Sequence, residues 1–332
     1  MRYGLAVLAG FALTALAWVA AVAVQLGVPT ESSRWPAELQ ARKAAIAEAT
    51  AGPDRLVLAG GSSTLFGLRA ATIMRETGLP TVNLGLTAAI GFDNILAFTR
   101  AHLRRGDTVL LSPEYVFFTQ AGFLRDSFID YVLARDPGYL DRLPPGERAA
   151  LVFSVPVRRL LQGVRARIKP ERTVPQFYEA ATIGELGDET GNGAGDRAPQ
   201  AARSLASLVR QPHAGAERRV ESAYRAVAGF VDWAKDNGVR VILSYPNFLA
   251  DDLYRQPAEQ AFFADLAAFY RSLGVAVVGA PEDFMFPGAS FFDHEYHLND
   301  RGAAIATDRM LDLLRPNLSA GAAAAASHAG RR

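Results

Sequence analysis

Short apolar runs that alternate with helix-like segments constrain the fold of this 332-residue chain most strongly. The runs are typical of strands buried on both faces of a parallel sheet, and they lie at 55–60, 80–84, 107–112, 239–245 and 275–278. The helix-like segments lie at 65–77, 93–103, 221–237, 258–273 and 300–314, the last with Asn299 as its N-terminal cap. Strands that alternate with helices imply right-handed crossovers, so we predict an α/β fold with a parallel sheet between two layers of helices.

The N-terminus carries an apolar segment from Tyr3 to Val28, with Arg2 before it and no further charge until Glu31. A helix of about 20 apolar residues crosses a bilayer core. The leading arginine and the absence of Lys or Arg just after the segment favour an N-in orientation. We therefore predict a single-pass signal anchor at 1–29 in the inner (cytoplasmic) membrane, with the remaining chain in the periplasm.

Two other interpretations of this segment stay open. The sequence Ala21-Val22-Ala23 has the small-x-small pattern of a signal-peptide cleavage site, although the apolar run is longer than the usual signal sequence. A buried helix of a soluble domain is the other, but no polar face interrupts the run.

The remaining chain divides into a spacer, a main domain and a tail. Residues 30–54 are charged and Ala-rich and predict a helical spacer, and 55–318 forms the α/β domain. The alternation stops at about 117–220, where a Gly-rich segment (184–195) predicts an irregular insertion over the sheet, serving as a lid or partner surface. Low complexity predicts a disordered tail at 319–332.

Composition excludes several classes of protein. The chain has no cysteine, which rules out a thiol nucleophile, a cysteine metal site and disulfides. A formal net charge of +1 gives no electrostatic footprint for nucleic acid.

Residues that follow the strands are the candidates for chemistry, because ligands of open α/β sheets bind beyond the carboxyl ends of the strands. Gly60-Gly61-Ser62-Ser63 follows the first strand, and a serine there would lie at a helix N-terminus. Asn83 to Ala88 follows the second strand, and Ser112-Pro113-Glu114-Tyr115 follows the third. Near the C-terminus, Asp293 precedes His297 by four residues, just before a helix. A serine needs a histidine base, and the histidine needs an orienting acceptor.

These blocks resemble the SGNH/GDSL hydrolase superfamily over about residues 55–315, apart from the insertion. Gly60-Gly61-Ser62 matches its Gly-Asp-Ser turn, with Gly61 in place of the aspartate. Asp293 and His297 match its Asp-x-x-His with one extra residue, followed by the familiar Leu-Asn-x-x-Gly run. The resemblance implies a flavodoxin-like three-layer fold and a triad of Ser62, Asp293 and His297.

The same resemblance implies an oxyanion hole formed by the amides of Ser62 and Gly85, with Ala88 as the other register. Ser62 is preferred to Ser63 as nucleophile because Gly67 then falls five residues on, as in related Gly-Ser-Ser variants. In the third block, Ser112-Pro113-Glu114-Tyr115 replaces the family's Gly-x-Asn-Asp. This puts the side-chain donor to the oxyanion in doubt, since an ionised Glu114 cannot donate a hydrogen bond.

A third block of this kind is similar to that of membrane-anchored proteins that modify envelope polymers, such as the D-alanyl-lipoteichoic acid biosynthesis and alginate O-acetylation proteins. That similarity implies a serine esterase or O-acyltransferase acting on an acylated polysaccharide, with a membrane-bound acyltransferase as a partner.

Two alternatives remain open: a non-catalytic scaffold that binds glycan or recruits an acyltransferase, and a protein that binds a small ligand at the sheet edge. The histidines His294 and His297, next to Asp293, could suggest a metal site. The local spacing offers no third ligand of the usual kind beside the two histidines. The sequence therefore implies no cofactor and no metal.

Overall fold

The computed structural model describes residues 2–120, 126–169, 177–193, 195, 198–215 and 218–329. The chain divides into two compact units, and the division falls within helix α2 (Glu31–Ala49). The first unit comprises Met1–Glu38, Ala89–Gly91 and Ala121–Tyr178, and the second comprises Leu39–Ala88, Phe92–Gln120 and Glu179–Arg332.

The second unit is built on a parallel sheet of five strands in the order β2-β1-β3-β4-β6. The strands are β1 (Leu56–Gly60), β2 (Thr81–Asn83), β3 (Thr108–Ser112), β4 (Arg240–Leu243) and β6 (Ala276–Val277). All five predicted runs therefore form strands. Their order is that of the flavodoxin-like doubly wound fold, which confirms the predicted fold class. A separate parallel pair joins β5 (Phe248–Leu249) to β7 (Met285–Phe286).

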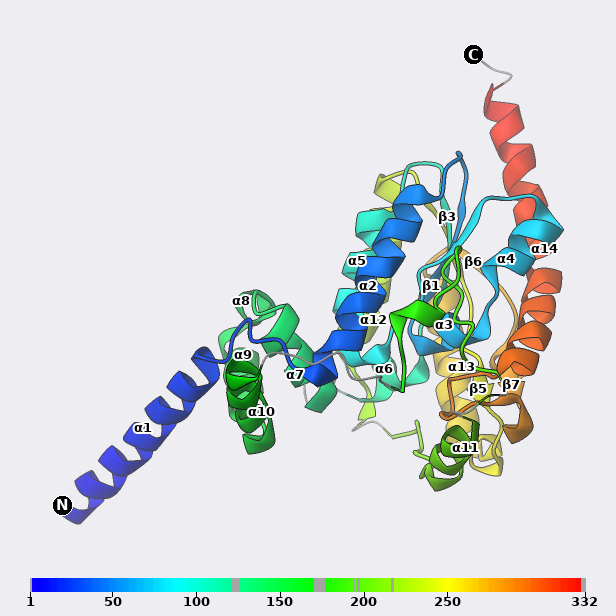
Figure 1. The fold of residues 1–332 in the computed structure, drawn as a ribbon. Helices are drawn as coiled ribbons and strands as arrows, with labels where there is room; N and C mark the ends of the chain where they lie inside the picture. Colours follow the sequence, from blue (N-terminus) through cyan, green and yellow to red (C-terminus); the bar gives the residue numbers. More distant parts are fainter. Residues whose placement is uncertain are drawn as a thin grey trace. The chain divides into compact units, whose positions relative to one another are not determined.

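Helices cover both faces of this sheet (Figure 1). On one face, α5 (Phe92–His102) contacts α12 (Glu221–Asp236), and on the other α4 (Ala70–Thr77) contacts α14 (Asp300–Ala329). The unit also contains α3 (Ser62–Gly67), α6 (Tyr115–Thr119), α11 (Ala198–Ser207) and α13 (Pro257–Ser272). The sheet core is apolar because strand residues such as Leu58 and Leu110 are fully buried.

The strand order reverses between β1 and β3, which places the topological switch point at their carboxyl ends. Gly60 at the end of β1 pairs with Ser112 at the end of β3. The segments that begin with Gly61 and Pro113 therefore leave the sheet side by side, at the position where open α/β sheets bind their ligands.

The predicted helix at 65–77 is wrong in one respect, because α3 and α4 are separate helices. Leu68 and Arg69 between them are extended. The Asp188 carboxylate accepts hydrogen bonds from the amides of Ala70 (2.7 Å) and Ala71 (3.1 Å). A carboxylate at a helix N-terminus stabilises a new start there, which explains the break. Asn299 does cap α14 as predicted, since its Oδ1 accepts from the Gly302 amide at 2.9 Å.

The first unit consists of helices. They are α1 (Arg2–Ala23), α7 (Asp126–Arg135), α8 (Tyr139–Arg142), α9 (Pro145–Phe153) and α10 (Val157–Ile168), with the first turns of α2. Val22 near the end of α1 is buried in a cluster with Phe128, Val132 and Leu151, and Trp18 Nε1 donates to the Val152 carbonyl at 2.9 Å. From Tyr3 to Ala23, α1 is long and apolar enough to cross a membrane, and most of it is exposed.

Two further expectations differ from the structure. The stretch at 117–220 was expected to be irregular, but α7, α9, α10 and α11 lie in it. In α10 the apolar residues at 157, 161, 164 and 168 have helical spacing, which the expectation of an irregular insertion left out of account. The described residues of the Gly-rich segment form neither helix nor strand, as predicted, yet the side chains of Asp188 and Asn192 are buried. Finally, α14 has bounds Asp300–Ala329, in keeping with the high helix propensity of alanine, and the disordered tail at 319–332 stays a prediction.

Candidate active site

Ser62 is the first residue of α3, directly after the turn that ends β1. Its side chain is 6% exposed, and Ser63 and Thr64 beside it are also buried. The structure thus places Ser62 as the sequence predicts, at a helix N-terminus beyond the carboxyl end of a central strand. A helix N-terminus favours negative charge nearby, which suits an alkoxide or an oxyanion.

Glu114 lies against this turn from the end of β3. Its carboxylate is fully buried, and Oε1 accepts hydrogen bonds from the Ser62 hydroxyl at 3.1 Å and from the Ser63 amide at 2.6 Å. Oε1 of Glu114 is therefore an acceptor to the serine turn. No motif in the sequence predicts that the side chain of Glu114 contacts Ser62.

Gly61 is small because Glu114 occupies the space beside it. A Cβ at position 61 would lie 2.6 to 2.8 Å from the Glu114 carboxyl atoms. No side chain fits there without moving Glu114. The two departures from the superfamily pattern, glycine at 61 and glutamate at 114, are therefore one structural feature.

Asp293 and His297 lie in the loop before α14 and contact one another. His297 Nδ1 is 2.8 Å from Asp293 Oδ1, and both side chains are buried. The backbone supports the loop, because the Phe292 amide donates to the His297 carbonyl at 2.7 Å and the His297 amide donates to the His294 carbonyl at 3.0 Å. A carboxylate at Nδ1 holds the proton there and leaves Nε2 as the basic nitrogen.

Phe66 connects the histidine to the helix of the serine. Its ring stacks on the His297 ring with centroids 4.2 Å apart and an interplanar angle of 12°. Phe66 is four residues after Ser62 in α3, and residues at this spacing share one face of a helix. His297 therefore lies over the face of α3 that carries Ser62. Among the described residues, the hydrogen bond of the Ser62 hydroxyl is to Glu114 and not to His297.

Gly85 packs directly against the backbone of α3. A Cβ there would lie 2.5 Å from the Leu65 nitrogen and 2.9 Å from the Leu65 Cα, so only glycine permits this approach. The Gly85 amide donates to Asn83 Oδ1 at 2.9 Å. In this structure the amide already has an acceptor, and the oxyanion role of Gly85 stays a prediction.

Asn83 and Lys43 form a buried polar group behind α3. Asn83 Nδ2 donates to the carbonyls of Thr64 (3.1 Å) and Leu68 (3.0 Å). The ammonium of Lys43 donates to the carbonyls of Asn83 (2.8 Å) and Gly187 (2.5 Å). Burial lowers the pKa of Lys43 to about 7, against the opposing effect of nearby Asp188 and Glu189. This group fixes the end of β2 against the helix that begins with Ser62.

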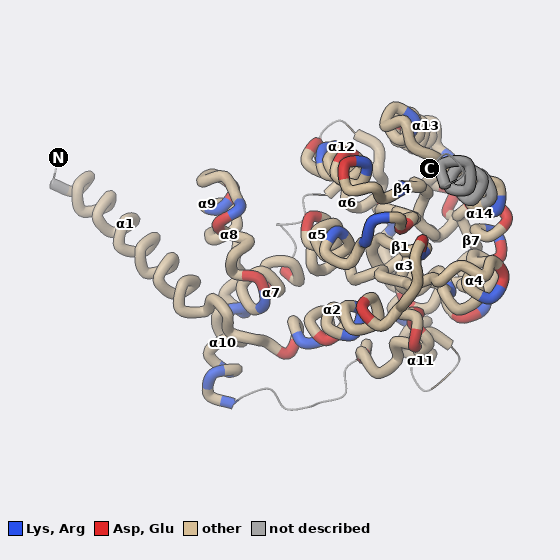
Figure 2. The backbone as a smooth tube through the Cα atoms, turned by 90° about the horizontal axis from the view of Figure 1, so that it is seen from above, with Lys and Arg blue, Asp and Glu red and all other residues tan. Residues whose placement is uncertain are grey.

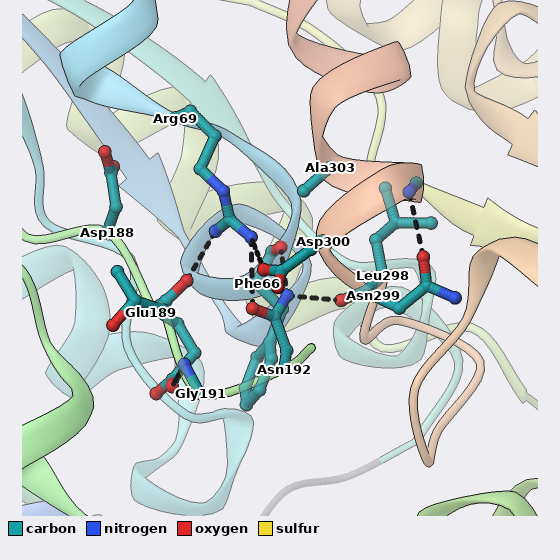
Figure 3. A network of polar contacts seen from close by, with 12 residues as sticks. Phe66, Arg69, Asp188, Glu189, Gly191, Asn192, Leu298, Asn299, Asp300 and Ala303 are labelled. Atoms are coloured by element: carbon teal, nitrogen blue, oxygen red, sulfur yellow. Dashed lines mark hydrogen bonds and ion pairs between the residues drawn. The ribbon is translucent and has the colours of Figure 1, made fainter. Parts of the chain in front are cut away.

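Asn192 joins the two halves of the candidate site, and sequence reasoning missed it. Its Nδ2 donates to the Leu298 carbonyl at 2.6 Å and to the Phe66 carbonyl at 3.3 Å (Figure 3). Leu298 directly follows His297 in the chain, and the Phe66 ring stacks on the His297 ring. Arg69 supports Asn192 by donating to its Oδ1 at 3.0 Å and to Asp300 at 2.8 Å. No local motif marks Asn192, because its partners are more than 100 residues away along the chain.

Other titratable groups do not form a metal centre. In the described part of the chain, no group of three or more His, Asp or Glu side chains is arranged to hold a metal ion. His213 pairs with Glu259, its Nδ1 lying 3.2 Å from Oε2. The buried hydroxyl of Tyr296 accepts a hydrogen bond from the Val116 amide at 3.3 Å, and burial raises its pKa well above the usual value, with a smaller effect of the neighbouring Glu295 and Glu114.

Comparisons with known proteins give only distant likenesses. No family model matches the chain, and no curated protein matches it. Among solved structures it is similar to YxiM of Bacillus subtilis, with 12% identity and a TM-score of 0.38, over 81% of this chain and 58% of that one. It is also similar to a "putative acylhydrolase" (BF3764) of Bacteroides fragilis, with 12% identity and a TM-score of 0.39, over 84% of this chain and 95% of that one. At these values the site geometry alone bears on function.

Proposed function

We propose that the chain is a serine esterase or O-acyltransferase that acts on acyl esters, with Ser62 as nucleophile, His297 as general base and Asp293 as the residue that orients His297. One observation supports this most: the buried His297–Asp293 pair, 2.8 Å from nitrogen to oxygen, lies against the helix that begins with Ser62. A histidine so oriented presents Nε2 for a proton.

The reaction would run in two halves. Ser62 Oγ attacks the ester carbonyl as its proton passes to His297 Nε2, and the tetrahedral intermediate forms. The alcohol then leaves with that proton, which gives an acyl-serine and neutral His297. In the second half, water regenerates the serine and releases an acid, or a sugar hydroxyl takes the acyl group. The same triad serves both outcomes.

The oxyanion would be held by two backbone amides, that of Ser62 at the start of α3 and that of Gly85, which packs against α3. A helix N-terminus adds favourable potential there. The Gly85 N–H donates to Asn83 Oδ1 in this structure, so it must turn from that oxygen to the substrate, or share its proton between them.

Glu114 would hold the serine turn in its resting state. The Ser62 hydroxyl donates to Glu114, so attack requires a rotation of this side chain from Glu114 toward His297. The Ser63 amide keeps Glu114 in place while the hydroxyl rotates. The resting contact is therefore compatible with catalysis.

The substrate and the place of action are also proposals. The apolar α1 supports a single-pass anchor with the catalytic unit in the periplasm. An anchored enzyme of this chemistry suits acyl esters of envelope or secreted polysaccharide, with a membrane-bound acyltransferase as a donor partner. Protease added to intact spheroplasts should digest the part of the chain that follows α1, and protection of that part would contradict the orientation.

The rival function is a non-catalytic scaffold that binds acylated glycan or a membrane acyltransferase. The contact of the Ser62 hydroxyl with Glu114 favours the scaffold, because in that function Ser62 is a structural residue of the turn, held by Glu114. A scaffold binds glycan without turnover and without a covalent adduct.

Turnover of an aryl acetate separates the two. Asp293→Asn keeps the shape of the side chain but leaves His297 in the wrong tautomer, and we expect a loss of about 10⁴ in kcat. Asp308→Asn, at an exposed position of α14, serves as control and should retain full turnover. An Asp293→Asn variant with nearly unchanged turnover would remove Asp293 from the triad, and Glu295 would be tested next.

A further inference from the structure

Helix α10 carries an apolar stripe on its outward face. Val157, Leu161, Val164 and Ile168 are 59%, 66%, 48% and 73% exposed. At about 100° per residue these four positions fall within about 60° of arc on the helix surface. A surface helix of a soluble domain buries such a stripe in its own core, but here it faces away from the unit.

The opposite face of α10 packs on the segment that leaves α1. Arg159 is buried, donates to the Val28 carbonyl at 3.2 Å and forms an ion pair with Asp130. Gly163 packs so closely on Gln25 that no Cβ fits between them. Arg167 donates to the Val24 carbonyl. Because α1 ends at Ala23, α10 lies within a few residues of the point where the apolar helix ends.

Basic side chains flank the exposed stripe. Arg165 lies to one side of it by the helical period, and Lys169 follows directly after the helix. Arg158 lies on the same side as Arg165 and pairs with Asp126. Figure 2 shows Lys and Arg at the C-terminal end of α10, while α1 carries no charged residue along its described length after Arg2. An apolar face bordered by Lys and Arg is the arrangement of helices that lie in the interface of a membrane with anionic lipids.

We infer that α10 is an interfacial helix, which inserts Val157, Leu161, Val164 and Ile168 into the bilayer surface beside α1. The inference rests on the proposed anchor and goes beyond it, because it fixes the first unit on the membrane at a second point. The apolar side chains enter the acyl region, and Arg165 and Lys169 reach anionic headgroups. The helix thereby sets how the first unit meets the lipid. It does not depend on the chemistry of Ser62.

The absence of cysteine gives a direct test. Single cysteines at Leu8, Leu161 and Gln162 are introduced into the full chain, labelled with a nitroxide and placed in nanodiscs of phosphatidylcholine and phosphatidylglycerol. Accessibility to oxygen and to a water-soluble nickel chelate gives the depth of each label. Leu8→Cys reports α1, and Gln162→Cys is the matched control, one residue from Leu161 and exposed off the stripe.

We expect the labels at 8 and 161 to favour oxygen, with 161 about 5–10 Å below the phosphates, and the label at 162 to favour the nickel chelate. A label at 161 as open to nickel as that at 162, with 8 buried in lipid, would overturn the interfacial helix and leave the anchor intact. A water-exposed label at 8 would overturn both. Spin–spin broadening at 161 that vanishes on dilution with unlabelled chain would show a second copy on the stripe and also contradict the inference.

The basic flank is tested in the same Leu161→Cys background. Arg165→Glu with Lys169→Glu should lower the ratio of oxygen to nickel accessibility at 161 at least twofold when phosphatidylglycerol is present. Since the attraction is electrostatic, 0.5 M salt should lower this ratio by a similar factor in the protein that keeps Arg165 and Lys169. A ratio unchanged by both treatments would contradict a role of these charges.

Discussion

The Ser62 hydroxyl donates a hydrogen bond to Glu114 Oε1 at 3.1 Å, and the same oxygen accepts the Ser63 amide at 2.6 Å. Glu114 thus lies beside the serine, in the block of the sequence where the resemblance predicts a side-chain donor. A buried carboxylate there holds the nucleophile at rest and opposes negative charge on a neighbouring oxyanion. Replacement of the Glu114 carboxylate should therefore change the rate of attack by Ser62.

Glu114→Gln should raise the rate at which a fluorophosphonate reacts with Ser62. The amide oxygen keeps the contact with the Ser63 amide, while the charge is removed and an N–H donor is gained. One oxyanion donor is worth roughly 10² to 10³ in rate, so we expect an increase of about tenfold or more. The second-order labelling rate at pH 8 measures it, with the exposed Glu76→Gln as control. Slower labelling of a folded Glu114→Gln protein would mean that the carboxylate assists the serine.

Gly61 and Glu114 should be coupled in stability. Gly61→Ala puts a Cβ about 2.6 Å from the Glu114 carboxyl and should destabilise the protein by about 1–3 kcal/mol. Glu114→Ala leaves the Ser63 amide unpaired and should cost about 1–3 kcal/mol. The double variant removes the clash, so its cost should be smaller than the two added together. Urea unfolding of the four proteins gives the coupling, and strict additivity would contradict the contact.

Asn192→Ala should lower turnover as well as stability. The variant leaves the carbonyls of Phe66 and Leu298 without this donor, at a cost of about 1–3 kcal/mol, and loosens His297 relative to α3. We expect kcat to fall at least tenfold with a small change in KM, because a positioning residue acts on the geometry of the reacting groups. Asn237→Ala is the control, since that amide bonds only the Trp233 carbonyl at the end of α12. A loss of stability with kcat unchanged would make Asn192 purely structural.

The sequence predicts the strands and the His297–Asp293 pair because each depends on neighbours along the chain. A run such as LVLAG at 56–60 is apolar throughout, and Asp293 and His297 lie in one short loop. Asn192, Arg69 and Glu114 escape such reasoning, since their partners are brought together only by the folded sheet. The stripe of α10 has helical spacing in the sequence, at 157, 161, 164 and 168, and it was missed because the whole stretch at 117–220 was expected to be irregular.

Lys43 should make the stability of the second unit depend on pH. Burial lowers its pKa to about 7 in the folded protein, while an unfolded lysine titrates near 10.4. Between these values the unfolded state binds more protons, so the free energy of unfolding should rise with pH from about 7 to 10. Lys43→Met should flatten this slope, and Lys235→Met, at an exposed position, should not. Urea midpoints measured at intervals of one pH unit test it, and the same slope in Lys43→Met would contradict it.

The identity of the nucleophile is the central claim, and adduct mapping with a fluorophosphonate probe tests it most directly. Full-length wild type, Ser62→Ala and Ser63→Ala are treated with the probe, digested and sequenced by mass spectrometry. We predict one adduct, on Ser62, absent from Ser62→Ala and retained in Ser63→Ala, in which the missing hydroxyl costs about 1 kcal/mol or less in stability. An adduct on Ser63, or no adduct on folded wild-type protein, would contradict the assignment of Ser62 as the catalytic serine.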